Sequence, residues 1–195
     1  MSDMALLPFK KELRRRMLTA RRQLSAAERD RYSGQIVQRL TARIEYQEAA
    51  CVFCYAAMTD EVQTQALLEQ MLTEGKTVCL PLITGKGSME AIELPSMDAL
   101  MTGEYGILTV RPEQRHFLDP ARIECVLVPG AAFARDGARL GMGGGYYDRF
   151  LPRTVRAKRL ALTFSCQLTE NIPMQERDCR VDAILTENEW IDCKR

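Results

Sequence analysis

The sequence predicts an α/β protein in which helices cover a mostly parallel β-sheet. Two observations carry this prediction. Short apolar runs alternate with segments of helical period between residues 50 and 186, and a glycine-rich turn follows one of the apolar runs. With 195 residues, of which 46% are hydrophobic and 27% charged, the chain has the size and composition of a single domain over residues 1–195.

Residues 1–44 predict two amphipathic helices. Ser25 and Glu28 form a capping-box pattern that ends one helix and begins the next. On each side of this pattern, apolar residues recur at spacings of three and four, which predicts one buried stripe per helix. The two stripes consist of Phe9, Leu13, Met17, Ala20 and Leu24, and of Tyr32, Ile36, Val37, Leu40 and Ile44.

Beyond residue 49 the chain alternates between predicted strands and helices. Apolar runs predict strands at Ala50–Ala57, Thr77–Ile83, Ser88–Leu94, Cys125–Pro129, Arg159–Phe164 and Ala183–Thr186. Helical patterns occur at Asp60–Glu74, at Ser96–Met101, where Ser96 is a candidate cap, and at Tyr146–Leu151, where Pro152 discourages continuation. The mixed pattern of Tyr105–Glu113 predicts neither element.

Charge and composition exclude several classes of function. A formal net charge of +1 gives no global attraction to nucleic acid or membranes. No run approaches the roughly 18 apolar residues of a membrane span, and the first residues lack the pattern of a signal peptide. Seven scattered cysteines suit a reducing compartment, so we expect a cytoplasmic protein. Cys51 and Cys54 form a C-x-x-C, but in a strand they would point to opposite faces, which favours buried thiols.

The positive charge is concentrated at the start of the chain. Residues 1–43 hold eleven Lys and Arg against four Asp and Glu, whereas the remainder is acidic. Such a segment can contact phosphates, but it can equally form two solvated helical faces. Lys10 and Arg14 are four residues apart and therefore lie on one face of the first predicted helix.

Six of the twelve glycines lie between Gly130 and Gly145. The segment from Arg139 to Asp148 follows a predicted strand and precedes a predicted helix, and glycines there would let backbone N–H groups converge on an anion. The spacing matches neither the P-loop nor the dinucleotide fingerprint. A phosphate or nucleotide site and a tight structural turn are both compatible with this segment.

These residues carry a resemblance to a known family. The segments Val126–Phe133 and Arg139–Arg149, with Gly137 between them, resemble the signature block of the 5-formyltetrahydrofolate cyclo-ligase family, also called methenyltetrahydrofolate synthetases. Shorter matches follow in the family's order, at Lys10-x-x-Leu13-Arg14, Asp60-Glu61, Asp178-x-x-Val181-Asp182 and Thr186-Glu187. The resemblance implies a three-layer α/β sandwich of the sugar-phosphate isomerase type, whose two N-terminal helices contribute to an ATP site.

The resemblance also implies a reaction. ATP and Mg²⁺ would support the conversion of 5-formyltetrahydrofolate to 5,10-methenyltetrahydrofolate, with release of ADP and phosphate. Phosphorylation of the formyl oxygen would create a leaving group, and N10 of the folate would then close the ring. Both nucleophiles belong to the substrate, so no catalytic side chain is required, and the single His116 is given no role. The expected partner is this small molecule alone, bound by a monomer.

The resemblance assigns residues to each ligand. The residues that would hold ATP are Lys10, Arg14, Arg139, Leu140, Gly141, Met142, Gly143, Gly144, Gly145, Tyr146 and Tyr147. Those that would contact the folate are Ala56, Glu61, Met142, Gly143, Gly144, Gly145 and Tyr146. Asp148 and Asp178 occupy the family's magnesium positions, and Mg²⁺ prefers such oxygen ligands. Met142 stands where many relatives carry a basic residue, so the loop backbone would have to meet an anion there.

Each assigned residue also has a purely structural interpretation. Lys10 and Arg14 fit a solvated basic helix, and the two tyrosines fit packing of the loop. Asp148 and Asp178 fit surface solvation or helix caps, and Glu61 fits the first turn of a helix. Two other functions suit a glycine loop of this kind, namely a non-catalytic sensor of a phosphorylated metabolite and a sugar-phosphate isomerase.

Overall fold

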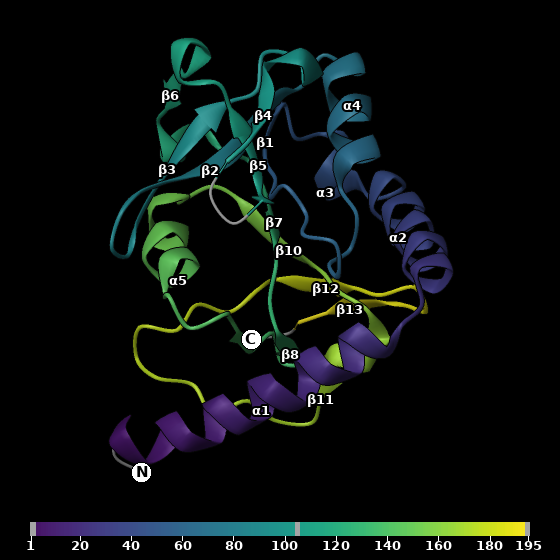
Figure 1. Ribbon diagram of the computed structural model, residues 1–195, viewed down its shortest axis with the longest axis vertical. Helices are drawn as coiled ribbons and strands as arrows, with labels where there is room; N and C mark the ends of the chain where they lie inside the picture. Colours follow the sequence, from purple (N-terminus) through teal and green to yellow (C-terminus); the bar gives the residue numbers. More distant parts are fainter. Residues whose placement is uncertain (1–2, 104–105, 194–195) are drawn as a thin grey trace.

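The computed structural model describes residues 3–103 and 106–193, and the chain begins with two helices joined at a sharp corner (Figure 1). Helix α1 (Asp3–Gln23) and helix α2 (Ala26–Thr41) meet at Ser25. The Ser25 hydroxyl accepts the amide of Glu28 at 3.2 Å, and the Glu28 carboxylate accepts the amide of Ser25 at 2.9 Å. The predicted capping box is therefore confirmed, and it satisfies N–H groups that the start of α2 would otherwise leave unpaired.

Strands from most of the chain build one large sheet. In the order β13-β12-β10-β7-β1-β2-β3-β6 it comprises Trp190–Asp192, Ala183–Leu185, Lys158–Leu162, Cys125–Val128, Cys51–Phe53, Thr77–Gly85, Ser88–Glu93 and Phe117–Leu118. The inner pairings, from β12 to β2, are parallel, whereas β13, β3 and β6 pair antiparallel at the edges. The predicted mostly parallel sheet is confirmed.

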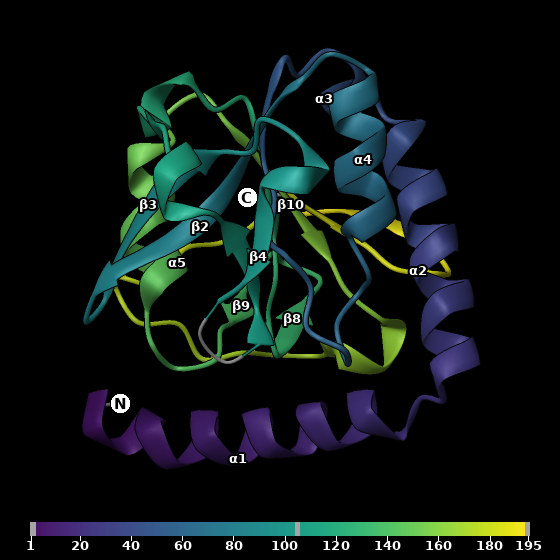
Figure 2. The same ribbon diagram turned by 45° about the horizontal axis from the view of Figure 1, so that its top comes forward.

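Helices cover both faces of this sheet, which makes three layers. Helices α2, α3 (Ile44–Gln47) and α4 (Gln65–Thr73) lie on one face, and the short α5 (Tyr146–Phe150) lies on the other (Figures 1 and 2). Alternate strand residues feed two separate apolar clusters: Val52 joins the α4 side and Phe53 the α5 side. Cys54 and Cys51 likewise belong to opposite clusters and are free thiols, as predicted for the C-x-x-C.

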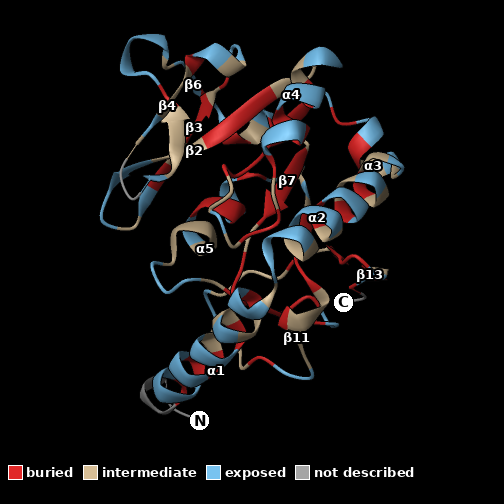
Figure 3. Cartoon of the chain, turned by 45° about the vertical axis from the view of Figure 1, so that its right-hand side comes forward, coloured by how far each residue is buried: buried red, intermediate tan, exposed pale blue. Residues whose placement is uncertain are grey.

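Helix α1 lies outside these layers, along one end of the molecule (Figure 2), with most of its surface exposed (Figure 3). Leu13 and Met17 pack against a small cluster that includes Ala132 and Leu140. The predicted stripe is wrong at Phe9, which is 53% exposed. The buried face of α1 instead carries Lys10 and Arg21, because both cations find carboxylate partners on the body of the protein.

Two small sheets and several short elements complete the described chain. Strands β8 (Ala132–Ala134), β9 (Arg139–Leu140) and β11 (Leu168–Thr169) form one sheet, and β4 (Leu100–Thr102) pairs with β5 (Leu108–Val110). Single 3₁₀ turns occur at Met97–Ala99, Pro112–Gln114, Pro120–Arg122, Leu151–Arg153 and Ser165–Gln167. Within the described residues, no helix is both long enough and apolar enough to span a membrane.

Several predicted boundaries shift. The helix predicted at Asp60–Glu74 begins only at Gln65, since residues 54–64 form a loop that turns back toward the sheet. The helix predicted at Ser96–Met101 is a 3₁₀ turn without a side-chain cap, and Met101 belongs to β4. Ile44 starts α3 and is 53% exposed instead of extending the α2 stripe. In the undecided segment Tyr105–Glu113, Tyr105 lies outside the described residues, and the remainder contains β5.

Candidate functional site

A cavity of about 520 Å³ opens where parallel strands end. Tyr55 and Ala56 follow β1, and Pro129 and Gly130 follow the adjacent β7. The chain leaves β1 through α4 on one face and leaves β7 through α5 on the other, so these neighbouring strands mark a switch point of the sheet. Crevices at the carboxyl ends of strands beside such a switch point are the usual ligand sites of open α/β sheets.

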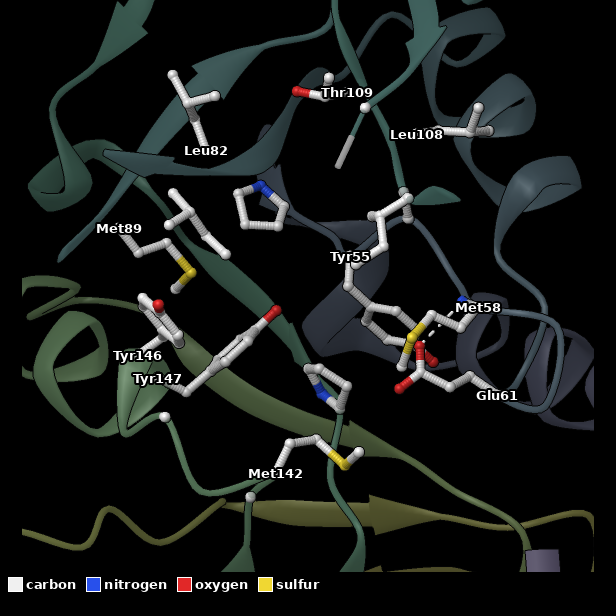
Figure 4. A pocket seen from close by; sticks show the side chains of 18 of the residues that line it. Tyr55, Met58, Glu61, Leu82, Met89, Leu108, Thr109, Met142, Tyr146 and Tyr147 are labelled. Carbon is white, nitrogen blue, oxygen red and sulfur yellow. Dashed lines mark hydrogen bonds between the residues drawn. The ribbon is translucent and has the colours of Figure 1, made fainter. Parts of the chain in front are cut away.

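Most of the cavity wall is apolar, which suits a flat organic ligand. Leu82, Ile83 and Met89 come from the β2–β3 hairpin, and Met101 and Leu108 come from the β4–β5 pair. Figure 4 shows Tyr55, Met58 and Glu61 on one side of this space and Tyr146 and Tyr147 on the other. The few polar groups therefore stand at defined places on an otherwise apolar wall.

The glycine loop forms one wall of the cavity. It runs from Gly141 to Gly145 between β9 and α5, and both Gly143 (φ 105°) and Gly145 (φ 65°) occupy the left-handed region that favours glycine. Helix α5 holds only five residues, so its dipole is small, and any grip on an anion must come from the loop amides. The helix predicted at Tyr146–Leu151 is thus confirmed as a short one, which ends one residue earlier.

Helix α1 places two cations beside the glycine loop. Arg14 Nε donates to the carbonyl of Gly141 at 2.8 Å, and its guanidinium lies 3.7 Å from where a Cβ on Gly143 would stand. Lys10 is 8% exposed, forms an ion pair with Asp178 and donates to Gln175 at 3.2 Å. These two side chains face the protein, so the interpretation of a solvated basic helix is wrong for this part of α1.

Both predicted magnesium ligands adjoin Cys179, Asp178 as its neighbour in the chain and Asp148 through a hydrogen bond. Asp148 Oδ1 accepts Arg139 at 2.8 Å and the amide of Cys179 at 3.2 Å. Asp178 Oδ2 accepts Lys10 and the amide of Gln175, the latter at 2.8 Å. In both carboxylates, the second oxygen makes no hydrogen bond to any described residue.

This arrangement fits Mg²⁺, which commonly takes one or two carboxylate oxygens and completes its shell with water and phosphate oxygens. Residues 3–103 and 106–193 contain no group of three or more His, Cys, Asp or Glu side chains able to hold a metal ion alone. A phosphate ligand would therefore have to supply part of the coordination. Asp182, in contrast, accepts the amide of Arg159 at 2.9 Å, which is a structural role between β10 and β12.

Glu61 lies on the opposite side of the cavity from Tyr146 and Tyr147. Its Oε2 accepts the amide of Met58 at 3.0 Å, and its Oε1 lies 3.6 Å from Arg21. Burial raises the pKa of Glu61, opposed by the Met58 amide and the Arg21 charge. Glu61 precedes α4 by several residues, so the interpretation as an acid in the first turn of a helix is wrong.

The cavity gathers most of the predicted site residues and leaves a few outside it. Ten of them line it, namely Ala56, Glu61, Arg139, Gly141, Met142, Gly144, Gly145, Tyr146, Tyr147 and Asp148. Lys10, Arg14, Gly143 and Asp178 lie beyond the lining, around the glycine loop. Leu140 is buried against α1 with Leu13 and Met17, so its side chain packs the loop and does not line the cavity.

Three arginines at the site were missed by the sequence reasoning. Arg21 is 2% exposed and holds Asp60 at 2.9 Å as well as Glu61. A signal for it existed, because Arg21 lies four residues after Met17 on the buried stripe. Arg149 donates to the carbonyls of Gly87 and Gly144 and so ties the β2–β3 hairpin to the glycine loop. No pattern in the sequence pointed to Arg115, which reaches the cavity through the fold alone.

The fold and cavity define a small-molecule-binding α/β protein, and comparison with known proteins supplies the family. The model of the 5-formyltetrahydrofolate cyclo-ligase family matches residues 8–187. The chain is 31% identical to 5-formyltetrahydrofolate cyclo-ligase of Mus musculus over 92% of this chain and 94% of that one. It is 30% identical to the enzyme of the same name from Escherichia coli strain K12, over 89% of this chain and all of that one.

A solved structure agrees with these relatives. The NMR structure of Aquifex aeolicus 5,10-methenyltetrahydrofolate synthetase superposes with a TM-score of 0.84 and 31% sequence identity, over 95% of this chain and 93% of that chain. The protein therefore belongs to the 5-formyltetrahydrofolate cyclo-ligase family and is an enzyme.

Proposed function

We propose that this enzyme converts 5-formyltetrahydrofolate to 5,10-methenyltetrahydrofolate with consumption of ATP. The main support is one juxtaposition: the glycine loop separates an apolar cavity of about 520 Å³ from the cationic face of α1. A folate ring system suits the apolar side, and a triphosphate suits the side with Arg14 and Lys10. The loop between them is where a γ-phosphorus and a formyl oxygen would meet.

The residues of the chain would act by binding and positioning. The loop amides and Arg14 would hold phosphate oxygens and offset the charge that develops there. Asp148 and Asp178 would share a magnesium ion with those oxygens, and the bound ion would supply neutralisation of phosphate charge. Glu61 would accept N–H groups from the donor-rich edge of the pterin. The formyl oxygen then attacks the γ-phosphorus and ADP leaves. N10 attacks the activated carbon and expels phosphate, which takes up the proton that N10 loses.

The test is to mix the purified protein with 5-formyltetrahydrofolate, ATP and MgCl₂ and to follow the absorbance of the methenyl product. We expect product and ADP to form in equal amounts, and neither to form when ATP is omitted or replaced by ADP. Binding of both ligands without turnover would favour a sensor. Turnover without loss of γ-phosphate would contradict the role proposed for ATP.

The pH dependence of folate binding should report on Glu61. Since burial raises its pKa, the carboxyl becomes protonated at a higher pH than an exposed glutamate, whose pKa is about 4.3. A protonated carboxyl can no longer accept two N–H donors, so KM for the folate should rise as the pH falls from neutral toward the pKa of an exposed glutamate. Steady-state kinetics across this range measures the effect.

The matched control is Glu61→Gln, which keeps the shape of the side chain but cannot titrate. Its KM should be raised at every pH and should lose the pH dependence over that range. If the variant kept the wild-type pH profile, the titrating group would lie elsewhere and Glu61 would not contact the folate through its charge.

The predicted cytoplasmic location and monomeric state belong to the same proposal and stay predictions, as does the assignment of residues 1–195 to one domain. Sedimentation of the free and ligand-bound protein tests the monomer directly. A stable dimer would contradict it.

A further inference from the structure

Three of the six buried side-chain polar atoms that have no hydrogen-bond partner among the described residues belong to residues that line the cavity. Among the described residues, Thr109 Oγ1, Arg139 Nε and Tyr147 Oη are buried and make no hydrogen bond, and all three residues line the cavity. Native proteins satisfy nearly all such atoms, so orphaned atoms facing one cavity indicate what a ligand must supply. The Arg139 guanidinium already donates to Pro129 and Asp148 through its other nitrogens. The Tyr147 side chain, in contrast, has one polar atom, Oη, and that atom has no hydrogen-bond partner.

The Tyr147 ring is held in place on both sides. It packs edge-on against Phe53 with ring centroids 6.3 Å apart, and the Arg139 guanidinium lies 5.5 Å from its centroid. Its side chain points toward the cavity, and the hydroxyl, which is itself buried, is directed between Met89 and Tyr55 (Figure 4). A ring fixed in this way presents its hydroxyl at one position, which is the condition for an oriented hydrogen bond to a ligand.

The Tyr147 hydroxyl also stays protonated, and can therefore donate a hydrogen bond, over the pH range in which enzymes work. Burial raises the pKa of Tyr147 far above its ordinary value, with the charges of Cys54 and Glu61 adding to the effect. The phenol therefore keeps its proton. A neutral phenol in an apolar wall offers one O–H to an acceptor, and a carbonyl oxygen of a ligand is the natural partner.

We propose that Tyr147 donates this hydrogen bond to the formyl oxygen of the folate, an inference that rests on the proposed function. Tyr147 is the second residue after the glycine loop, so its side chain approaches the cavity from the wall at which the γ-phosphorus would lie. Glu61 occupies the far side and would take the donor edge of the pterin, which turns the formyl group toward Tyr147.

This contact is compatible with the chemistry. An amide-type oxygen has two lone pairs, so one can accept the Tyr147 O–H while the other forms the bond to phosphorus. The bond between the γ-phosphorus and the bridging oxygen of ADP breaks in the same step, and no proton is transferred to or from Tyr147. The hydrogen bond fixes the direction of the attacking lone pair, which makes Tyr147 a residue that touches the reacting atom.

The experiment compares Tyr147→Phe with the wild-type enzyme in two assays. In the first, binding of 5-formyltetrahydrofolate and of tetrahydrofolate, which lacks the formyl group, is measured calorimetrically without ATP. We expect affinity for the formyl compound to fall roughly tenfold and affinity for tetrahydrofolate to stay unchanged. In the second, kcat/KM for the folate should fall roughly tenfold to a hundredfold, while KM for ATP stays within about twofold.

Tyr46→Phe serves as the matched control. Tyr46 is 2% exposed and donates to Glu74 at 2.8 Å, away from the cavity, so its loss should lower the melting temperature without changing either assay. Tyr147→Phe should leave the melting temperature unchanged or raise it, because it removes an unpaired buried polar atom.

Equal losses of affinity for both folates would overturn the assignment, since the hydroxyl would then contact the ring system. Unchanged binding and unchanged kcat/KM would show that the tyrosine only packs the loop. The ATP-free binding assay keeps these outcomes separate from failure of the proposed function, which would appear as absence of methenyl product from the wild-type enzyme.

Discussion

Changing Asp148 to asparagine should lower kcat by about a hundredfold or more, because the variant loses the charge that would share a magnesium ion with the phosphates. The amide keeps an oxygen that can accept from Arg139 and from the Cys179 amide, so the local hydrogen bonds are largely retained. Turnover at several magnesium concentrations measures the effect. The variant should need a higher magnesium concentration than the wild type for half-maximal turnover.

The same change should also cost stability. The Arg139 side chain is 3% exposed and would keep a buried charge without its counterion, at a cost of about 1–3 kcal/mol in the free energy of unfolding. Asp178→Asn is the matched comparison, because its partner Lys10 is also a buried cation. A kcat within about threefold of wild type would remove Asp148 from the reaction.

Replacing Arg21 with methionine should destabilise the protein by about 3–5 kcal/mol, since it leaves Glu61 buried without its cationic partner. Asp60 would lose its 2.9 Å contact with the same guanidinium. Urea unfolding at pH 7 gives the free energy. Folate affinity should fall as well, because Arg21 and the Met58 amide together hold the Glu61 carboxylate in place.

The destabilisation caused by Arg21→Met should be smaller at low pH. The direction of this pH dependence follows from the raised pKa of Glu61. Burial raises that pKa, and removal of Arg21 raises it further, so the folded state binds a proton more tightly than the unfolded state. The part of the destabilisation that comes from Glu61 is complete above the raised pKa of the variant and is gone below the pKa of an unfolded glutamate, about 4.3. Arg22→Met is the control. The Arg22 side chain is 68% exposed and 3.5 Å from Asp60, so its substitution should cost less than about 0.5 kcal/mol in the free energy of unfolding, both at pH 7 and at low pH. Equal effects of the two variants would contradict a structural role for buried Arg21.

Local signals in the sequence identified the elements well and their ends poorly. The capping box at Ser25 placed the junction of α1 and α2 correctly, because a cap is made by residues only three apart. The strand predicted at Ala50–Ala57 is only Cys51–Phe53, since the next residues stay buried in a loop held by Thr64, whose hydroxyl donates to Tyr55. Apolar composition reports burial and cannot distinguish a buried loop from a strand.

The glycine block indicated the site, but the charges around it were decided in three dimensions. Lys10 and Asp178 are 168 positions apart, and Arg139 meets Asp148 only because β9 and α5 enclose a tight loop. Phe9 was predicted to be buried and is 53% exposed, whereas Lys10, predicted either to hold ATP or to be a solvated cation, is 8% exposed. The buried face of a helix is predicted from its apolar residues. A cation can nevertheless lie on that face if it pairs with a carboxylate from a distant part of the chain.

By itself, the sequence determined the α/β class, the two opening helices and the glycine loop, because periodicity, caps and glycine spacing act between near neighbours. The tertiary structure alone decided which charges pair, how the cavity is walled by β2–β3 and β4–β5, and that the Tyr147 hydroxyl stands unpaired within it. Those features depend on contacts between segments far apart in the chain, and such contacts leave no periodic trace in a single sequence.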